Sequence, residues 1–311
     1  MLTKLLQKYP FLVLDGAFGT EITNRGFDTN DELWAAKALF ERPELVRSVH
    51  YDYYRAGADI VSSASYQASV EGFEKKGYSR SESKKLIQDS VALVRAARDA
   101  FLRDTADTAL RNRPAPLAAA SVGPYGAYLA DGSEYRGDYT LSRAELSDFH
   151  EERLALLIEA QPDLLAFETL PLLDEALVLV SDLKRRGDAA AWCSFSCKDE
   201  KHISSGEPIA EAARILDKEP QIVAIGLNCT APDYVTSLIR EIRSVSDKPI
   251  VVYPNTGETY NAVTKTWHGA ATSYTDYVKQ WHEAGARLIG GCCRTTPDTI
   301  RDIAGFRKTL M

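Results

Sequence analysis

The amino-acid sequence predicts a (β/α)8 barrel that forms a single domain over residues 1–311. Short apolar runs alternate with longer amphipathic stretches along the whole chain, and eight such pairs can be distinguished. A chain of 311 residues with 45% hydrophobic content is also large enough to fill one such core. The near-regular spacing of the pairs and the lack of a linker favour a closed barrel over an open sheet.

Each predicted strand is a nearly continuous apolar run, as expected for a parallel strand that is buried on both faces. In chain order, the predicted strands are 11–15, 59–63, 117–121, 164–168, 190–196, 222–228, 249–253 and 287–291.

The stretches between the strands have the amphipathic pattern of helices that cover a barrel. The predicted helices lie near 32–56, 79–103, 141–160, 173–186, 208–217, 231–246, 273–284 and 296–308. The last one has the clearest start, because Thr296 can cap it and Pro297 occupies the first helical position, where the missing N–H costs little.

Two connections are longer than a barrel needs. Residues 122–142 follow the third strand and residues 254–273 follow the seventh, and both are rich in Tyr, Trp or Gly. Loops of this length usually carry function or are disordered, and the composition of these two is not that of a disordered tract.

Composition excludes several classes of function. The net charge is −7, with 37 basic and 44 acidic residues and no basic block, which argues against nucleic acid as a partner. The apolar run from Phe11 to Leu14 is too short for a signal segment or a membrane span, so we expect a soluble cytoplasmic protein. Five cysteines without a secretory segment indicate reduced thiols with a metal-binding or catalytic role.

The residues that end the predicted strands form an unusual set, and in a barrel these strand ends build the active site. They are Asp15, Ser62, Ser63, Glu168, Asn228, Cys229, Cys292 and Cys293. Three thiols therefore converge on one rim. Three thiolates with an open fourth position are typical of a catalytic zinc site, since a structural zinc would have four protein ligands.

Simpler interpretations of the cysteines stay open. Cys292 and Cys293 could be buried small hydrophobic residues or a vicinal disulfide, and Cys229 alone would suit a core position. Cys193 is predicted to pack in the core, and Cys197 has no predicted role.

Other polar residues are weaker signals. The five histidines show no metal-ligand spacing, although His268 lies in the long loop after strand seven. Asp15 could be a turn residue and Glu168 a structural ion-pair partner. Together, however, two carboxylates facing a thiolate-bound metal suit a ligand with an ammonium group and a sulfur end.

The chemistry of such a site is thiol alkylation. A free thiol has a pKa of roughly 8.5 and is mostly protonated at neutral pH, whereas a coordinated thiol is deprotonated. Zinc would therefore supply a sulfur nucleophile that attacks an activated carbon.

Several motifs together make the chain resemble the homocysteine S-methyltransferase family over essentially its whole length. They are "LDGAFGTE", "HYDYYRAGADI", "SASYQAS", "SVGPYGAYLADGSEYRGDY", "FETLP", "GLNC", "VVYPNTGE" and "GARLIGGCCRTTP". The third-strand loop is similar to the branch that uses S-methylmethionine or S-adenosylmethionine. The resemblance implies methyl transfer from such a donor to L-homocysteine, which forms L-methionine.

The same resemblance implies roles for individual residues. Cys229, Cys292 and Cys293 would be ligands of a zinc cofactor, and Asp15 and Glu168 would recognise the amino group of homocysteine. Other substrate candidates at the rim are Ser63, where other branches carry threonine, and Asn228.

A sulfonium donor is a cation, and aromatic side chains of the two long loops could face it. The candidates are Tyr125, Tyr128, Tyr135 and Trp267.

Two other functions remain alternatives at this point. One is a metal-free barrel lyase or isomerase that binds phosphate through Gly290 and Gly291. The other is a non-catalytic sensor that reads zinc or redox state through the three cysteines. The sequence does not indicate an oligomeric state.

Overall fold

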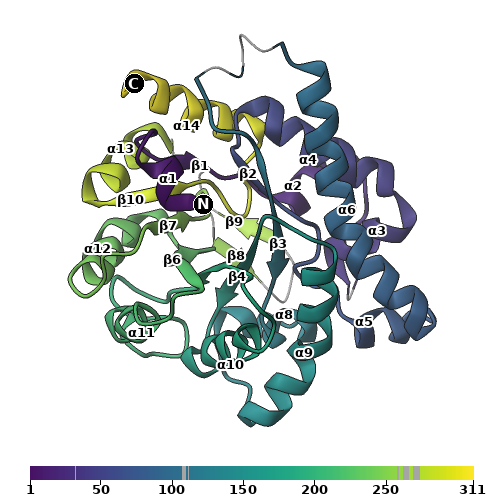
Figure 1. Ribbon diagram of the computed structural model, residues 1–311. Coiled ribbons are helices and arrows are strands. Elements are labelled where there is room, and N and C mark those ends of the chain that lie inside the picture. Colours follow the sequence, from purple (N-terminus) through teal and green to yellow (C-terminus); the bar gives the residue numbers. More distant parts are fainter. Residues whose placement is uncertain (32, 107–109, 111, 258, 262–265, 269–273) are drawn as a thin grey trace.

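The computed structural model describes the chain except for residues 32, 107–109, 111, 258, 262–265 and 269–273, and it describes only the backbone of 259–261 and 266–268 (Figure 1). The strands form a ring and the helices surround it (Figure 1).

The ring consists of eight parallel strands, which confirms the predicted (β/α)8 barrel. They are β1 (Leu12–Val13), β2 (Ile60–Ser62), β3 (Leu117–Val122), β4 (Leu164–Leu170), β5 (Ala191–Phe195), β6 (Ile222–Asn228), β7 (Ile250–Tyr253) and β10 (Ala286–Ile289). Their spatial order is β1-β10-β7-β6-β5-β4-β3-β2. A parallel bridge between Leu14 and Ile60 joins the first strand to the last in this order, so the barrel is closed.

The outer layer contains all eight predicted helices, with ends that differ by a few residues. They are α4 (Pro43–Ala56), α6 (Arg80–Asp104), α9 (Arg143–Glu159), α10 (Leu173–Lys184), α11 (Ile209–Leu216), α12 (Pro232–Arg243), α13 (Tyr274–Ala284) and α14 (Pro297–Thr309).

The first predicted helix, 32–56, is wrong in its extent. The segment forms η1 (Trp34–Lys37), α3 (Ala38–Glu41) and α4. The break lies at Arg42, whose ψ of 58° is not helical, because the residue before a proline is driven out of the α region. Pro43 then begins α4.

Short elements occupy segments that the hydrophobic pattern leaves unassigned, because each is too short to show a helical or strand period. They are α1 (Leu2–Leu6), α2 (Phe18–Asn24), α5 (Val70–Lys75), α8 (Tyr125–Leu129), η2 (Ser133–Tyr135), β8 (Thr259–Asn261) and β9 (Thr266–His268). The loop after β3 therefore contains α8 and η2, and the loop after β7 contains the β8–β9 hairpin.

The core has two layers. One lies between the strands and the helices, and the other fills the barrel, where Trp192 and Leu288 are among the buried side chains. Leu2 of α1 belongs to the inner layer and closes the N-terminal end of the barrel. At Gly226, an added Cβ would lie 1.7 Å from the carbonyl oxygen of Val251, so only glycine permits this approach of β6 to β7.

A buried ion pair ties the end of the chain to the barrel. Arg307 of α14 contacts the carboxylate of Asp59, which also accepts a 2.8 Å hydrogen bond from the amide of Val13. Both charged side chains are at most 2% exposed. The pair therefore connects α14, β1 and the start of β2 at the N-terminal end of the barrel.

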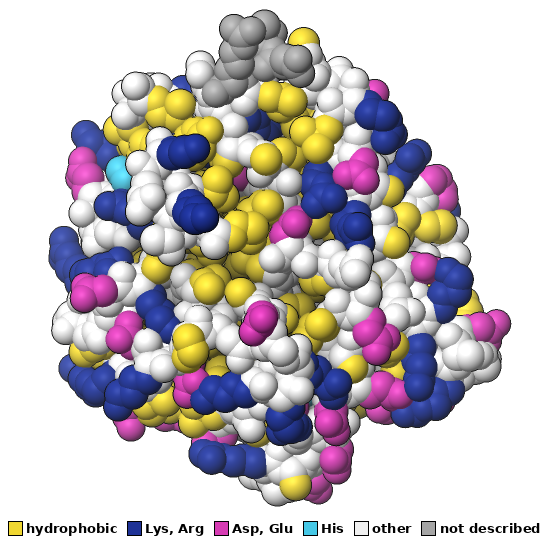
Figure 2. Space-filling view, in the orientation of Figure 1, with side chains coloured by type: hydrophobic (Ala, Val, Ile, Leu, Met, Phe, Trp, Pro, Cys, Tyr) yellow, Lys and Arg dark blue, Asp and Glu magenta, His cyan; other side chains and the backbone are white. Residues whose placement is uncertain are grey.

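The surface view agrees with the charge pattern of the sequence. On the face shown in Figure 2, basic and acidic side chains are interspersed around a more apolar centre. Within the described part of the chain, no helix is long and apolar enough to span a bilayer.

Candidate metal and substrate site

Three cysteines meet at the C-terminal rim of the barrel. Cys229 directly follows β6, whereas Cys292 and Cys293 come shortly after β10. Their sulfur atoms all lie within 4.8 Å of one another, and the three residues form a group that could hold a metal ion. Adjacent positions after one strand thus supply two sulfurs, and a strand two places away in the ring supplies the third.

Hydrogen bonds to the end of β7 and to the two residues after it hold these cysteines. The amide of Cys229 donates to the carbonyl oxygen of Tyr253 at 3.1 Å, and the amide of Cys292 donates to that of Pro254 at 2.8 Å. The amide of Cys293 donates to Asn255 Oδ1 at 3.1 Å. A single segment between the two cysteine-bearing strands therefore sets the position of all three residues.

The two glycines before the pair are needed for close packing. A Cβ on Gly290 would lie 2.6 Å from Leu14 Cβ, and one on Gly291 would lie 2.5 Å from the Thr295 side chain. The amide of Gly290 donates to the carbonyl oxygen of Val252, and the amide of Gly291 donates to that of Asp15. With both N–H groups used, this segment does not support the phosphate-binding alternative.

One pair of cysteines differs from the expected free thiols. The structure joins Cys229 and Cys292 in a disulfide, and Cys293 is free. The rim brings the two residues together from strands 63 positions apart in the chain, with their Cα atoms 5.3 Å apart. The vicinal disulfide between Cys292 and Cys293 does not occur. Because a disulfide has no thiolate to offer a metal, only the reduced pair can act as ligands.

Cys193 and Cys197 lie apart from this cluster. Cys193 is fully buried in the core, as predicted, and Cys197 is partly buried after β5.

Two carboxylates lie at the same rim. Asp15 Oδ2 accepts a 2.8 Å hydrogen bond from the amide of Ser62. Glu168, at 8% exposure, accepts hydrogen bonds from Ser121 Oγ and from the Tyr253 hydroxyl, the latter at 2.9 Å. Neither carboxylate forms an ion pair with any residue that the structure describes.

Burial dominates the electrostatics of both groups. Burial raises the pKa of Asp15 well above its usual value, the bond from Ser62 opposes this, and the charge of Glu168 adds to the rise. Burial also raises the pKa of Glu168, against the opposing effect of the bonds from Ser121 and Tyr253. Two neighbouring carboxylates, one half-buried and one buried, without a cation favour a ligand that brings a positive charge.

Ser63 and Asn228 have partners within the protein. Ser63 Oγ lies 2.7 Å from Ser65 Oγ and accepts a bond from the amide of Ser121. Asn228 Oδ1 accepts from the amide of Thr169 at 2.7 Å, and its Nδ2 donates to Thr169 Oγ1 at 2.7 Å. The buried Asn228 amide therefore joins the ends of β4 and β6 beside Cys229.

The aromatic residues predicted to bind the methyl donor lie in different places. The Tyr135 hydroxyl lies 3.9 Å from Cys293 Sγ. Tyr125 and Tyr128 instead pack on each other and on Phe149, with ring centroids 5.0–5.6 Å apart. The side chains of Trp267 and His268 lie outside the described part of the structure.

Tyr253 is a site residue that the sequence reasoning missed. Its hydroxyl accepts from Trp192 Nε1 at 2.9 Å, lies 2.7 Å from Ser194 Oγ and donates to Glu168. Its backbone carbonyl accepts from Cys229. Tyr253 ends a strand, so the strand-end rule contained the signal, although it was not applied to this strand.

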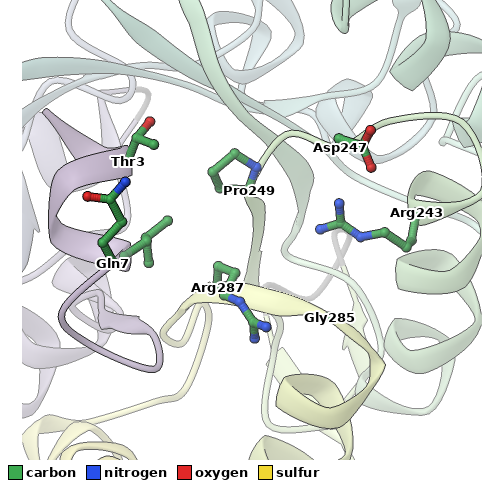
Figure 3. Close-up of a pocket in the computed structure, with 8 residues that line it drawn as sticks. Thr3, Gln7, Arg243, Asp247, Pro249, Gly285 and Arg287 are labelled. Carbon is green, nitrogen blue, oxygen red and sulfur yellow. The ribbon is translucent and has the colours of Figure 1, made fainter.

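The opposite end of the barrel has a cavity of about 520 Å³. Thr3 and Gln7 of α1 face Arg243 and Asp247 across it, and Arg287 lies at its edge (Figure 3). It opens where the strands begin and is therefore separate from the cysteine cluster.

The barrel and the cysteine cluster define a class of protein: a (β/α)8 barrel with a thiol-rich group at its catalytic rim that could hold a metal. The sequence profile of the homocysteine S-methyltransferase family matches residues 12–306. The chain belongs to this family.

Individual relatives agree with this assignment over nearly the whole chain. A homocysteine S-methyltransferase of Bacillus subtilis is 51% identical over 98% of this chain and 97% of its own. A homocysteine methyltransferase of Escherichia coli has been solved in a metallated form and in an oxidized form. Each of the two structures matches with a TM-score of 0.88 and 45% identity over 98% of this chain and 99% of that chain.

Proposed function

We propose that this protein is a zinc-dependent enzyme that transfers a methyl group from a sulfonium donor, S-methylmethionine or S-adenosylmethionine, to L-homocysteine and so forms L-methionine. The observation that carries the proposal is the group of three sulfur atoms within 4.8 Å of one another at the catalytic rim. Membership of the homocysteine S-methyltransferase family supports the reaction class.

The donor set fits zinc. Three cysteine sulfurs are soft ligands, and three protein ligands leave a position for substrate, as in catalytic rather than structural zinc sites. Cys229, Cys292 and Cys293 would hold the ion in the reduced protein. When bound, zinc would lower the pKa of the homocysteine thiol, so that the thiol is present as a thiolate.

The chain's own residues would bind and orient homocysteine. Asp15 and Glu168 provide negative charge for its ammonium group, because neither carboxylate forms an ion pair with a residue that the structure describes. Tyr253 links the two ends of this site, since its hydroxyl donates to Glu168 and its carbonyl accepts from Cys229. One residue thus fixes the distance between the ammonium-binding group and a sulfur ligand.

The remaining candidates take different parts in this proposal. Ser63 and Asn228 hold the strand ends in register around the substrate, because their polar atoms bond to other rim residues. Among the aromatic candidates, Tyr135 is best placed for the donor, since it contacts Cys293. Tyr125, Tyr128 and Trp267 remain predictions.

Zinc binding would require reduction of the disulfide. Only after reduction of the Cys229–Cys292 bond would the three thiolates be available together. The solved metallated and oxidized forms of the Escherichia coli relative support two such states.

The first test measures metal and turnover together. The reduced protein is analysed for zinc, and methionine formation is followed with each sulfonium donor in turn. We expect about one zinc per chain and homocysteine-dependent methionine. Cys229→Ser should lose both, while the matched control Cys197→Ser should keep both. Zinc without methyl transfer would favour the sensor, and turnover by a zinc-free protein would refute the proposal.

A further inference from the structure

The loop after β3 places Glu134 at the rim that carries the cysteine cluster. Glu134 lies in η2 and directly precedes Tyr135, whose hydroxyl is 3.9 Å from Cys293 Sγ. The backbone carbonyl of Glu134 accepts a 2.8 Å hydrogen bond from Ser196 Oγ, just after β5. Ser204 Oγ in turn donates to Ser196 Oγ at 2.8 Å. The backbone at Glu134 is therefore attached to the rim of the barrel.

The packing of α8 also limits where Glu134 can lie. A Cβ on Gly126 would come within 2.6 Å of the Glu134 amide nitrogen, so α8 touches η2 directly. Gly137, with φ 65°, turns the chain beside Pro171, which follows β4, and Ser205, which lies in the loop after β5. The loop is held on both sides of Glu134, which fixes the position of its backbone.

Glu134 has no counter-ion within the described structure. Its Oε2 atom is buried and has no hydrogen-bond partner there. Arg136 is the nearest cation in the sequence, but its Nε donates to Asp138 at 2.8 Å, its Nη1 to the Asp131 carbonyl oxygen and its Nη2 to Ser133 Oγ. Burial consequently raises the pKa of Glu134 to about 7, although its own backbone amide opposes the rise.

The charge of Glu134 reaches groups of the proposed active site. Burial raises the pKa of Cys293 to about 11, and the negative charge of Glu134 contributes to that rise. Burial likewise raises the pKa of Tyr66 and of Tyr135, and Glu134 adds to both increases. Glu134 therefore acts electrostatically on the sulfur and on both phenols.

The proposed reaction supplies a cation at this place. A methyl group that is transferred to a sulfur at the cysteine cluster must come within about 3–3.5 Å of it in a reactive geometry. The donor must therefore lie against residues that surround the cysteine cluster, and Tyr135 is one of them. Its sulfonium and its ammonium are both positive, and a desolvated carboxylate binds a cation through a charge-assisted contact. Asp15 and Glu168 are already assigned to homocysteine.

We propose that Glu134 is the counter-ion of the methyl donor's positive charge, with Tyr135 beside the bound cation. The inference rests on the methyl transfer proposed above and adds the residue that selects a cationic donor. A contact with the sulfonium would distinguish the donor from the methionine product, because the thioether of methionine is neutral and would leave the carboxylate without a partner.

The test compares Glu134→Gln with the natural protein and with Asp138→Asn. Glutamine keeps the shape of the side chain and removes its charge. Asp138→Asn removes a charge of the same sign from the same loop, at an exposed residue that pairs with Arg136. Zinc content, the KM for homocysteine and the KM for S-methylmethionine are measured for all three proteins.

We expect Glu134→Gln to raise the donor KM by about ten- to a hundredfold, the range for loss of one charge-assisted contact. Zinc content and homocysteine KM should stay within about twofold, and Asp138→Asn should behave like the natural protein. An unchanged donor KM, or an equal rise in the homocysteine KM, would overturn the assignment. Failure of the proposed function itself looks different, because the natural protein would then form no methionine.

A second ligand identifies which charge Glu134 contacts. A dimethylsulfonium carboxylate without an amino group is tested as a competitive inhibitor against S-methylmethionine. Weaker inhibition of Glu134→Gln than of the natural protein assigns the contact to the sulfonium. Equal inhibition, together with the raised donor KM, assigns it to the ammonium.

Discussion

The unpaired carboxylate of Glu134 should make the protein less stable as pH rises, and Glu134→Gln should remove that loss. Burial raises the pKa of this group from its usual 4.5 to about 7 in the folded protein. Below pH 4.5 the carboxyl is protonated in both the folded and the unfolded state and has no effect. Between pH 4.5 and 7 the unfolded state ionises first, so the natural protein loses stability until both states are ionised.

The size of the effect follows from the two pKa values. At 1.36 kcal/mol per pH unit, the rise from 4.5 to about 7 corresponds to about 3 kcal/mol at pH 8 or above. For a chain of 311 residues this is roughly 5 °C in melting temperature. Charged groups around Glu134, namely Asp131 and Arg136, are unchanged in the variant, so the comparison isolates the one carboxyl.

The assay is urea denaturation of the reduced protein without substrates, at several pH values between 4.5 and 8.5. Glu134→Gln should match the natural protein at pH 4.5 and exceed its free energy of unfolding by about 3 kcal/mol at pH 8.5. Asp138→Asn should show no such gain in the free energy of unfolding over the natural protein as pH rises, because pairing with Arg136 lowers the pKa of Asp138. If the free energy of unfolding of Glu134→Gln differed from that of the natural protein by the same amount at every pH, the reasoning would be refuted.

Two further substitutions test the substrate site and the barrel. Glu168→Gln should raise the KM for homocysteine by about ten- to a hundredfold through loss of a charged contact, while the zinc content stays unchanged. Steady-state kinetics and metal analysis measure these two quantities. An unaltered KM would remove Glu168 from the substrate site. Gly226→Ala should destabilise the protein by about 1–3 kcal/mol or more, because its Cβ would lie 1.7 Å from the Val251 carbonyl oxygen. Urea denaturation measures that loss, and wild-type stability would contradict the close approach of β6 to β7.

Local sequence pattern was sufficient for the strands and most of the covering helices. A strand buried on both faces needs a continuous apolar run, so each strand is visible without knowledge of its neighbours. Arg42 and Pro43 show where local reasoning was applied incompletely, since the residue before a proline avoids the helical region. Short elements such as η2 have no period that a sequence could show.

The sequence predicts those residues of the candidate site that lie at the ends of the strands. The position of Cys229 and Cys292 after their strands follows from the barrel itself, because the carboxyl ends of all its strands face one rim. The disulfide between them is a matter of distance across that rim, which the sequence does not contain. Asn228 stood at a strand end like the others, yet its amide binds Thr169 on a neighbouring part of the rim.

The sequence by itself determined the barrel, the rim on which the thiols gather and the resemblance to a methyltransferase family, because hydrophobic period and strand-end position are local properties. Only the tertiary structure decided which polar groups have partners. Glu134 and Arg136 are two residues apart, yet the fold buries Oε2 of the first without a partner among the described residues and pairs the second with Asp138. Burial and charge pairing depend on contacts between distant segments, and those contacts exist only once the barrel has closed.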